Sequence, residues 1–493
     1  MVAISPAPPV LAARRGVLML LLLCAVQFLD IVDSSIMNVA LPSIRRDLGF
    51  SQQGLQWVLS GYLVTYGGFL LLGGRLADVL SRRGLLAAGT TVFGACSLAG
   101  GLAPTASVLV AARIAQGVGA AMMAPAGLSI LTTTFAEGRD RTRALGVWGA
   151  VSGLAAASGV FLGGVLSAGP GWRWVLFVNL PVCGLVVATT LLLVPGEAAR
   201  PRTAGGFDVA GAALVTGGML LLVYALVRAP EIGWGSAHTI GELGTAAALV
   251  AAFTGVQRRS RDPLFPFAIL RVRGLAAADA TQLIAFAGFL SLFYFLTLYM
   301  QNVLGYSPIR AGSAYLPVTA GIAVAAGLST RLVPRTGTRP IIVAGALTAA
   351  AGIAYLSRVP VPGSYATDLL PGLVVMSVGL GALFVTVTAA ANAGVPAGQA
   401  GLAAGLLNTS LQLGSALGLA VFSAIAATHT RHLLTAGTAP APALAAGFGR
   451  AVLAASIALA AAALVALRAT NNRGNPAPPQ PATAAAPDPG SAA

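Results

Sequence analysis

Two acidic residues, Asp30 and Asp33, lie inside the first long apolar run of the chain, "GVLMLLLLCAVQFLDIVDSSIMNVALP" at residues 16–42. An ionised side chain near the middle of a bilayer costs about 2.5 kcal/mol or more on insertion scales, so acids in such a run are functional candidates. On a helix the two carboxyl groups share one face with Gln27 and, one turn on, Met37. A low-dielectric surround disfavours a charged carboxylate, so the pair could hold and release a proton. The alternative is a structural pair that neighbouring helices satisfy.

The composition indicates a membrane protein. The 493 residues are 57% hydrophobic and only 9% charged, whereas about 25% of the residues in a soluble domain are charged. All 29 basic residues are Arg, and the net charge is +15. Most of them fall in short loops between apolar runs, which favours the positive-inside rule of membrane topology over nucleic-acid binding. Lipid is therefore the expected solvent for most of the surface.

Fourteen apolar segments are each long enough to cross the bilayer as a helix. They lie at residues 16–38, 55–74, 85–103, 107–131, 144–167, 174–194, 208–228, 239–256, 275–300, 311–330, 340–357, 367–390, 401–427 and 447–467. An all-α integral membrane protein with 14 transmembrane helices is therefore predicted. The first segment has a basic start like that of a secretory signal, but no clean cleavage site follows, so we expect an uncleaved first helix.

The Arg residues predict the orientation of these helices. With both termini on one side, that side carries twenty Arg residues, the other side carries eight, and Arg113 alone lies inside a helix. Because cytoplasmic loops carry the excess of basic residues, both termini are predicted to be cytoplasmic and the protein to be multi-pass in the cell membrane. Residues 1–15 would form a cytoplasmic tail, and the Pro- and Ala-rich residues 471–493 a disordered one.

A faint internal repeat divides the chain. "RLADVLSRRGLLAAG" at 75–89 aligns with "RLVPRTGTRPIIVAG" at 331–345, an offset of 256 residues. Each copy joins the second and third helices of a six-helix set, and repeated halves are typical of secondary transporters. We therefore expect an N-terminal six-helix bundle at 16–194, two inserted helices at 208–256 and a C-terminal six-helix bundle at 275–467.

Five stretches carry motifs in a fixed order. They are "VDSSIMNVALPSI" (32–44), "GGRLADVLSRRG" (73–84), "ARIAQGVGAAMMAP" (112–125), "GVWGAVSGLAAASGVFLGGVL" (146–166) and "WRWVLFVNLPV" (172–182). In this order and spacing they resemble the motifs of the fourteen-helix drug:proton antiporters of the major facilitator superfamily. The resemblance covers residues 16–467 and implies proton-driven export by alternating access.

Three residues are selected for proton coupling: Asp33, Asp30 and Arg113. The resemblance places the family's first-helix acid on Asp33, which makes it the predicted proton carrier, while Asp30 tunes it or pairs with Arg113. The guanidinium of Arg113 cannot shed its charge, so it needs an anion or an aqueous cavity. A purely structural ion pair is the alternative. Gly117 and Ala121, four residues apart on the same helix, would let another helix come close.

The family's loop motif implies a gate, in which charged contacts hold the cytoplasmic side closed. Its residues are Gly74, Asp78, Arg82 and Arg83, with Arg335 and Gly337 in the second copy, where the first copy has Val79 and Ser81. Solvated charges that only set the topology are the alternative. The fifth predicted helix would contribute a hinge of glycines, which permit close helix contact. They are Gly149, Gly153, Gly159, Gly163 and Gly164, and close packing without a mechanistic role is the other interpretation.

Candidate substrate-lining residues have side chains that adapt to varied apolar shapes or that offer an amide or a hydroxyl. They are Gln27, Met37, Tyr62, Tyr66, Gln116, Met122, Met123 and Gln301. Each could instead be an ordinary core residue. The sequence has no GxxxxGK[ST] nucleotide-binding loop, no HExxH motif and no Ser/His/Asp pattern. We therefore expect no enzyme activity, no metal and no cofactor, with protons as the coupling ion.

The sequence thus predicts a proton-coupled efflux pump for lipophilic drugs or antibiotics. Its partners would be a small lipophilic substrate and the lipid bilayer, without nucleic acid, and it would act as a monomer. Two alternatives stay open: an exporter of an endogenous lipid or metabolite on the same fold, and a non-transporting membrane sensor or scaffold. Asp33 and Arg113 inside the spans argue against the scaffold, because charges in a membrane are expensive without a use.

Overall fold

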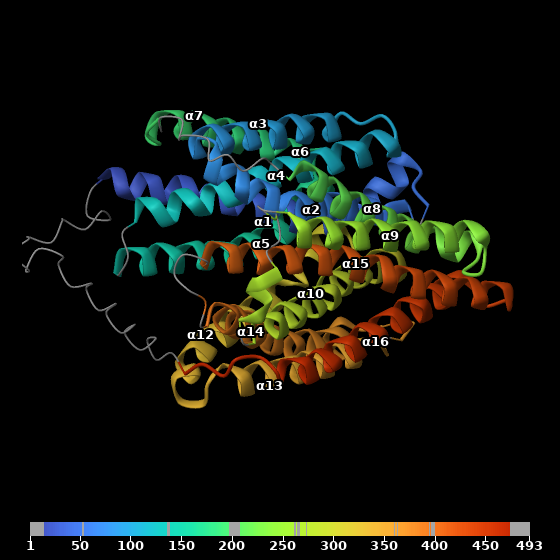
Figure 1. Ribbon diagram of the computed structural model, residues 1–493. Coiled ribbons are helices and arrows are strands. Elements are labelled where there is room, and N and C mark those ends of the chain that lie inside the picture. The colour runs from blue at the N-terminus through green and yellow to red at the C-terminus, as the bar shows by residue number, and fades with distance from the viewer. Residues whose placement is uncertain are drawn as a thin grey trace, which may run out of the picture.

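The computed structural model describes residues 14–51, 54–135, 139–196, 208–260, 263, 267–272, 274–358, 360–361, 363–393, 395 and 400–473. Within these ranges the chain is helical, as predicted, and most helices run along one common direction (Figure 1). Lipid favours this arrangement, because only helices and closed barrels satisfy every backbone N–H and C=O group without water.

The helices follow the predicted order along the chain. The first part contains α1 (Arg14–Leu48), η2 (Gly54–Gln56), α2 (Trp57–Val79), α3 (Arg82–Gly101), α4 (Ala106–Thr134), α5 (Arg139–Ala168), α6 (Trp174–Phe177) and α7 (Asn179–Leu193). Next come α8 (Val209–Ile232) and α9 (Ala237–Arg259). The last part contains η3 (Phe267–Arg271), α10 (Leu275–Leu298), η4 (Tyr299–Val303), α11 (Pro308–Ser313), α12 (Leu316–Thr336), α13 (Thr338–Leu356), η5 (Tyr365–Leu369), α14 (Leu370–Asn392), α15 (Ala400–Thr435) and α16 (Pro440–Ala466).

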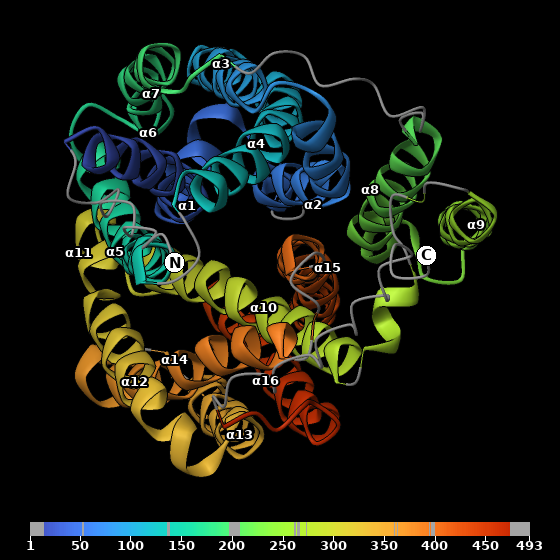
Figure 2. The same ribbon diagram turned by 60° about the vertical axis from the view of Figure 1, so that its left-hand side comes forward.

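These helices form two bundles with a pair of helices beside them. α1 to α7 group together, α10 to α16 group together, and α8 packs against α2 and α15 while α9 packs on α8 (Figure 2). We call the end of the molecule where α1 begins the Arg14 end, and the end where α1 stops the Asp47 end. We call α1 to α7 the first bundle and α10 to α16 the second bundle. The boundary between the two bundles extends from the Arg14 end to the Asp47 end.

Equivalent helices of the two bundles begin at the distance of the sequence repeat. α3 begins at Arg82 and α13 at Thr338, which are 256 residues apart. Ser81 caps α3 by accepting a hydrogen bond from the N–H of Gly84, whereas Gly337 precedes α13 with a φ of +88°. Only glycine adopts this φ without strain.

Eleven helices in the described ranges are long and apolar enough to cross a membrane. α2, α5 and α8 have 23, 30 and 24 residues, so each also exceeds the roughly 20 residues that span a bilayer. The chain is therefore a multi-pass membrane protein.

After α16 the chain returns to the start of α13 at the Arg14 end. The hydroxyl of Thr338 donates to the carbonyl oxygen of Thr470 over 2.8 Å, and the N–H of Thr338 donates to that of Asn472 over 2.9 Å. Asn471 and Asn472, at the start of the predicted disordered tail, are thus bonded to the start of α13. Residues 474–493 of that predicted tail, and residues 1–13, lie outside the described ranges.

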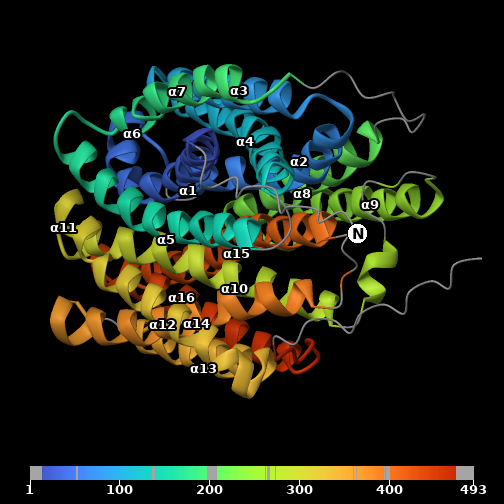
Figure 3. The same cartoon turned by 90° about the vertical axis from the view of Figure 1, so that its left-hand side faces the viewer.

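Two other helices approach the backbone of α5 at the predicted hinge glycines. A Cβ atom on Gly163 would lie 2.6 Å from a backbone carbonyl oxygen of α1, and one on Gly164 would lie 2.8 Å from a backbone carbonyl oxygen of α11. A Cβ atom on Gly159 would overlap a serine side chain of α1. α5 runs along the boundary between the bundles (Figure 3), so these glycines permit close contact on both sides of it. Gly149 and Gly153 belong to α5, but their surroundings lie outside the described part.

Candidate functional site

Asp33 and Arg113 form a buried ion pair between α1 and α4. Nη1 of Arg113 lies 2.6 Å from Oδ2 of Asp33, and the two side chains are 1% and 0% exposed. Nε of Arg113 donates to the backbone carbonyl of Val58 over 3.0 Å, and Nη1 also donates to Oε1 of Gln116 over 2.8 Å. Such charge-assisted bonds hold both charges, and removing either partner would leave the other charge uncompensated.

Two amides bind the second carboxylate oxygen of Asp33. Nε2 of Gln116 donates to Oδ1 over 2.9 Å, and Nδ2 of Asn179 donates to it over 2.7 Å. Both amides also donate to the hydroxyl of Ser97, over 2.9 and 3.1 Å. α1, α3, α4 and α7 therefore meet at Asp33. The sequence prediction included Gln116 but missed Ser97 and Asn179, although Asn179 lies in the quoted stretch 172–182.

Asp30 has a different surround from Asp33. The hydroxyl of Tyr62 donates to its Oδ1 over 2.9 Å, and the hydroxyl of Tyr66 donates to its Oδ2 over 2.8 Å. The side chain is 5% exposed, and no cation of the described ranges lies within ion-pair distance. Of the two roles predicted for Asp30, tuning Asp33 or pairing with Arg113, the pairing is made by Asp33 instead, because the rotation of α1 turns Asp33 toward α4.

Tyr62 links the two acids. Its ring lies under the guanidinium of Arg113, with 4.4 Å between Cζ and the ring centroid, while its hydroxyl binds Asp30. A cavity of about 10 Å³ adjoins this point, lined by Ser34, Leu59, Tyr62, Leu63, Arg113 and Leu290. That volume holds one water molecule at most. Because Leu290 belongs to α10, the two bundles meet beside the ion pair and leave no room for a drug-sized molecule there.

Tyr66 connects Asp30 to the second bundle. The side-chain amides of Asn408 and Gln412, both in α15, interact with the Tyr66 hydroxyl. α2 and α15 pack closely against each other beside Tyr66, since a Cβ atom on Gly67 of α2 would lie 3.0 Å from Cβ of Gln412 in α15. The hydroxyl that donates to Asp30 can therefore accept from an amide across the boundary between the bundles.

The predicted packing motif in α4 brings α2 close to it. A Cβ atom on Gly117 would lie 2.5 Å from the carbonyl oxygen of Tyr62. One turn on, the backbone of Ala121 contacts Gly73 of α2. This close contact places Tyr62 and Val58 over Arg113, so the small residues position the partners of the ion pair.

The predicted gate residues lie at the Arg14 end, where the structure describes the contacts of some of them. Nη2 of Arg83 donates to the carbonyl oxygen of Leu191 over 2.7 Å and so satisfies the last turn of α7. Arg82 is buried at the start of α3, and Arg335 is exposed in the last turn of α12. A Cβ atom on Gly74 would meet nothing within 4 Å. The side chain of Asp78 lies outside the described part.

The predicted substrate-lining residues divide into three groups. Met37 and Met123 are fully buried in the hydrophobic cores, and Met122 packs against one of these cores. The second group is the polar network itself, with Tyr62, Tyr66 and Gln116. The third group is half-buried and consists of Gln27 and Gln301.

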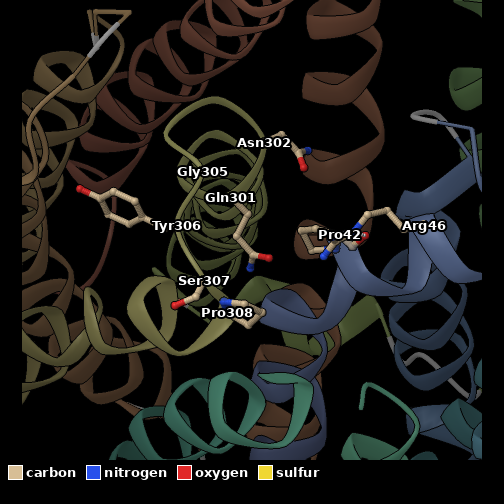
Figure 4. Close-up of a pocket in the computed structure, with 8 residues that line it drawn as sticks. All are labelled: Pro42, Arg46, Gln301, Asn302, Gly305, Tyr306, Ser307 and Pro308. Atoms are coloured by element: carbon tan, nitrogen blue, oxygen red, sulfur yellow. Dashed lines mark hydrogen bonds between the residues drawn. The ribbon is translucent and has the colours of Figure 1, made fainter. Parts of the chain in front are cut away.

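Gln301 lines a cavity of about 410 Å³ at the Asp47 end, between α1 and the segment from η4 to α11 (Figure 4). Its amide donates to the carbonyl oxygen of Val39 over 2.9 Å. The lining residues are Pro42, Arg46, Gln301, Asn302, Gly305, Tyr306, Ser307 and Pro308. Pro42 lies nine residues beyond Asp33 on α1, about 13 Å along the helix axis. This cavity is therefore separate from the ion pair.

The structure contains a third membrane acid that the sequence prediction missed. Asp279, in the second turn of α10, is 5% exposed, and neither carboxylate oxygen has a hydrogen-bond partner in the described ranges. The available signal was the single Asp in "LAAADATQLIAF". No three His, Cys, Asp or Glu side chains gather around a possible metal position in the part of the chain that the structure describes.

Comparisons with known proteins point in one direction. A family model described as Major Facilitator Superfamily matches residues 23–419. The puromycin resistance protein pur8 of Streptomyces alboniger is 41% identical over 430 residues, which cover 86% of this chain and 84% of that protein. The cephamycin export protein CmcT of Amycolatopsis lactamdurans is 38% identical over 416 residues, which cover 83% of this chain and 85% of that protein.

Among solved structures, a bacterial homologue of the human lysosomal transporter Spinster, in an inward-facing and occupied conformation, has a TM-score of 0.63. The alignment covers 91% of this chain and 95% of that chain at 18% sequence identity. At this identity the likeness shows the fold alone.

Proposed function

Because the chain belongs to the Major Facilitator Superfamily and is a transporter rather than an enzyme, we propose that it exports lipophilic drugs or antibiotics across the cytoplasmic membrane in exchange for protons. Two relatives are named for puromycin resistance and cephamycin export, which supports export over import. In this proposal the proton is the coupling ion, no cofactor takes part, and the working unit is a monomer in the lipid bilayer.

The proposal includes fourteen membrane-crossing helices with both termini in the cytoplasm. It is supported by the eleven candidate spans together with the lengths of α2, α5 and α8. The division of twenty Arg residues against eight supports the orientation. The Arg14 end would then face the cytoplasm, and the Asp47 end the outside.

The observation that carries the proton coupling is the unequal surround of the two acids on α1. Protonation of Asp33 would leave the buried Arg113 without its counter-charge, which makes Asp33 a poor proton carrier. Asp30 has two neutral hydroxyl donors instead. It can therefore gain or lose a proton without leaving an opposite charge unpaired. We assign the proton to Asp30 and a fixed counter-charge to Asp33 and Arg113.

Tyr66 can couple the protonation of Asp30 to the movement of the bundles. Its hydroxyl donates to Asp30 and interacts with Asn408 and Gln412 of the second bundle. A change in the charge of Asp30 changes how strongly it holds the Tyr66 hydroxyl, and with it the contact across the boundary. The glycines of α5 would let the bundles rock against each other at the α1 and α11 contacts.

Uphill and downhill transport in everted membrane vesicles test this assignment. Asp30→Asn should abolish dye accumulation driven by an imposed pH gradient, because the amide cannot carry the proton. It should retain downhill exchange of the same dye, which needs no proton. The matched control is Asp47→Asn, which neutralises an exposed acid on the same helix and should accumulate dye at close to the wild-type rate.

Two results would contradict the proposal at different levels. If Asp30→Asn still accumulates dye against its gradient, the proton is not on Asp30. If the wild-type protein moves no lipophilic drug or dye in either direction, drug export itself is wrong.

A further inference from the structure

The proposed coupling mechanism leaves Asp279 without a role. It is buried, and both of its carboxylate oxygens lack a partner within the described part of the chain. One turn further along α10, Gln282 is 4% exposed, and its Oε1 lacks a partner among the same residues. All three oxygens are hydrogen-bond acceptors. Buried acceptors without a donor are unfavourable, so this position favours a donor beyond those that the described part of the chain supplies.

An aromatic stripe continues from these two residues along α10. Phe286, Phe289 and Phe293 fall within about 80° of Asp279 around the helix, at about 100° per residue. The ring of Phe286 stacks on Phe384 of α14 at a centroid distance of 4.4 Å, and Phe289 meets the same ring edge-on at 5.5 Å. All four rings are only half-buried, so they keep surface that a ligand could cover.

One residue on this side of α10, Leu290, lies next to the first bundle. Leu290 lies about 20° from Asp279 around the helix, and it borders the small cavity that Tyr62 and Arg113 also line. The neighbouring Leu283 packs on Gly414 of α15. Leu290 thus places this side of α10 beside the boundary between the bundles, and the phenylalanine rings follow the same side while packing on α14.

We propose that Asp279, Gln282 and this aromatic stripe bind substrates that join a protonated amine to an aromatic or lipophilic body. The ammonium group donates to the Asp279 carboxylate and to Oε1 of Gln282, which supplies the missing donors. The body lies against the phenylalanine rings, whose faces attract organic cations. Phe286 is seven residues from Asp279, about 10 Å along the axis, which suits a drug-sized molecule.

A bare proton explains these observations less well than an amine does. One proton supplies one donor and leaves the other acceptors without a partner. A proton also does not explain why half-buried phenylalanine rings lie on the same side of the helix as Asp279. In the proposed orientation Asp279 lies near the cytoplasmic end of α10, where an exported substrate enters. The inference rests on the proposed drug export and specifies its substrate class.

Transport of a matched pair of fluorophores by the full-length protein tests this inference. Dansylcadaverine carries a primary amine, and its N-acetyl derivative has the same fluorophore without the charge. Asp279→Asn should raise the KM for dansylcadaverine at least tenfold and change that for the N-acetyl derivative less than twofold. Asp279→Glu, which keeps the charge, should recover most of the loss. Asp368→Asn removes an acid at the other end of the second bundle, beside the N–H of Ser364, and should leave both KM values unchanged.

The two fluorophores separate the possible outcomes. An equal loss for both would make Asp279 a coupling or folding residue, and an unchanged KM for both would show that it binds no amine; either result overturns the inference. Binding of each fluorophore to purified Asp279→Asn in detergent gives the same comparison without the transport cycle. If the wild-type protein transports neither compound, the proposed export fails instead. Transport of both without discrimination by Asp279→Asn rejects the amine site alone.

Discussion

α1 and α10 each open one of the two bundles, yet their membrane acids have opposite surroundings. Asp33 on α1 accepts hydrogen bonds from Arg113, Gln116 and Asn179. Asp279 on α10 accepts none within the described ranges. The first bundle therefore fixes a charge in place, whereas the second leaves acceptor groups that a ligand could satisfy.

Asp30 lies between these extremes and makes the comparison more informative. Its two tyrosine hydroxyls are neutral donors that hold it in position, and no counter-charge lies beside it in the described ranges. An acid in a buried ion pair cannot easily change its charge, because the loss of either charge leaves the other buried and uncompensated. An acid with neutral donors can change its charge, and an acid with no donor favours whatever ligand brings one. We therefore expect mutations to affect stability at Asp33, coupling at Asp30 and substrate choice at Asp279.

The largest effect on stability should come from Asp33→Leu. It leaves the guanidinium of Arg113 buried without a counter-charge, which should lower the free energy of unfolding by about 3–5 kcal/mol. The loss can be measured as a fall in the thermal unfolding midpoint of the purified protein in detergent. The double variant Asp33→Leu, Arg113→Leu should recover part of the loss, because it buries no unpaired charge.

Asp47→Leu is the matched control for the buried pair. Asp47 binds Arg173 at 2.5 Å, but the two side chains are 47% and 39% exposed. Because Asp47 also accepts from the indole N–H of Trp172, its loss should lower the free energy of unfolding by about 1–2 kcal/mol. If Asp33→Leu and Asp47→Leu lower the free energy of unfolding equally, burial does not make the Asp33–Arg113 pair costlier to break than an exposed pair.

Substitution of Asp279 by Leu should change the free energy of unfolding in the opposite direction to Asp33→Leu. Asp279→Leu removes acceptors that have no donor, so it should raise the free energy of unfolding by about 1–3 kcal/mol. The measurement is again the thermal unfolding midpoint in detergent, without substrate. A decrease comparable to that of Asp33→Leu would show that Asp279 has a stabilising partner, and the contrast between the bundles would disappear.

Much of the fold could be predicted because it depends on local patterns. Apolar run lengths gave the positions of the helices, and the offset of 256 residues gave matching starts for α3 and α13. The close contact at Gly117 and Ala121 was also predictable, since only small side chains let two helix backbones meet. Asp33, Arg113 and Gln116 were also identified as candidates, because polar and charged residues within apolar segments are unusual.

The partners within the site were less predictable, because they depend on how each helix is rotated about its axis. Asp30 and Asp33 lie on one broad face, and a rotation of about 60° decides which of them meets α4. The two buried methionines Met37 and Met123 show the same limit, since residue type does not separate a core position from a cavity wall. Asp279 was missed because a single acid near the start of an apolar run resembles an interfacial charge.

The smallest expected effect concerns the contact that joins the two bundles. Tyr66 belongs to the first bundle and Gln412 to the second, and their side chains interact while Tyr66 also donates to Asp30. A double-mutant cycle with Tyr66→Phe and Gln412→Ala should give a coupling free energy of about 0.5–1.5 kcal/mol in thermal unfolding. Tyr62→Phe is the matched control, because Tyr62 donates to the other oxygen of Asp30 and its ring lies against Arg113 of the first bundle. Tyr62→Phe and Gln412→Ala should therefore be additive within about 0.5 kcal/mol. Equal coupling in the two cycles would place the link between the bundles in general packing, and Tyr66 would lose its assigned part in transmitting the protonation of Asp30.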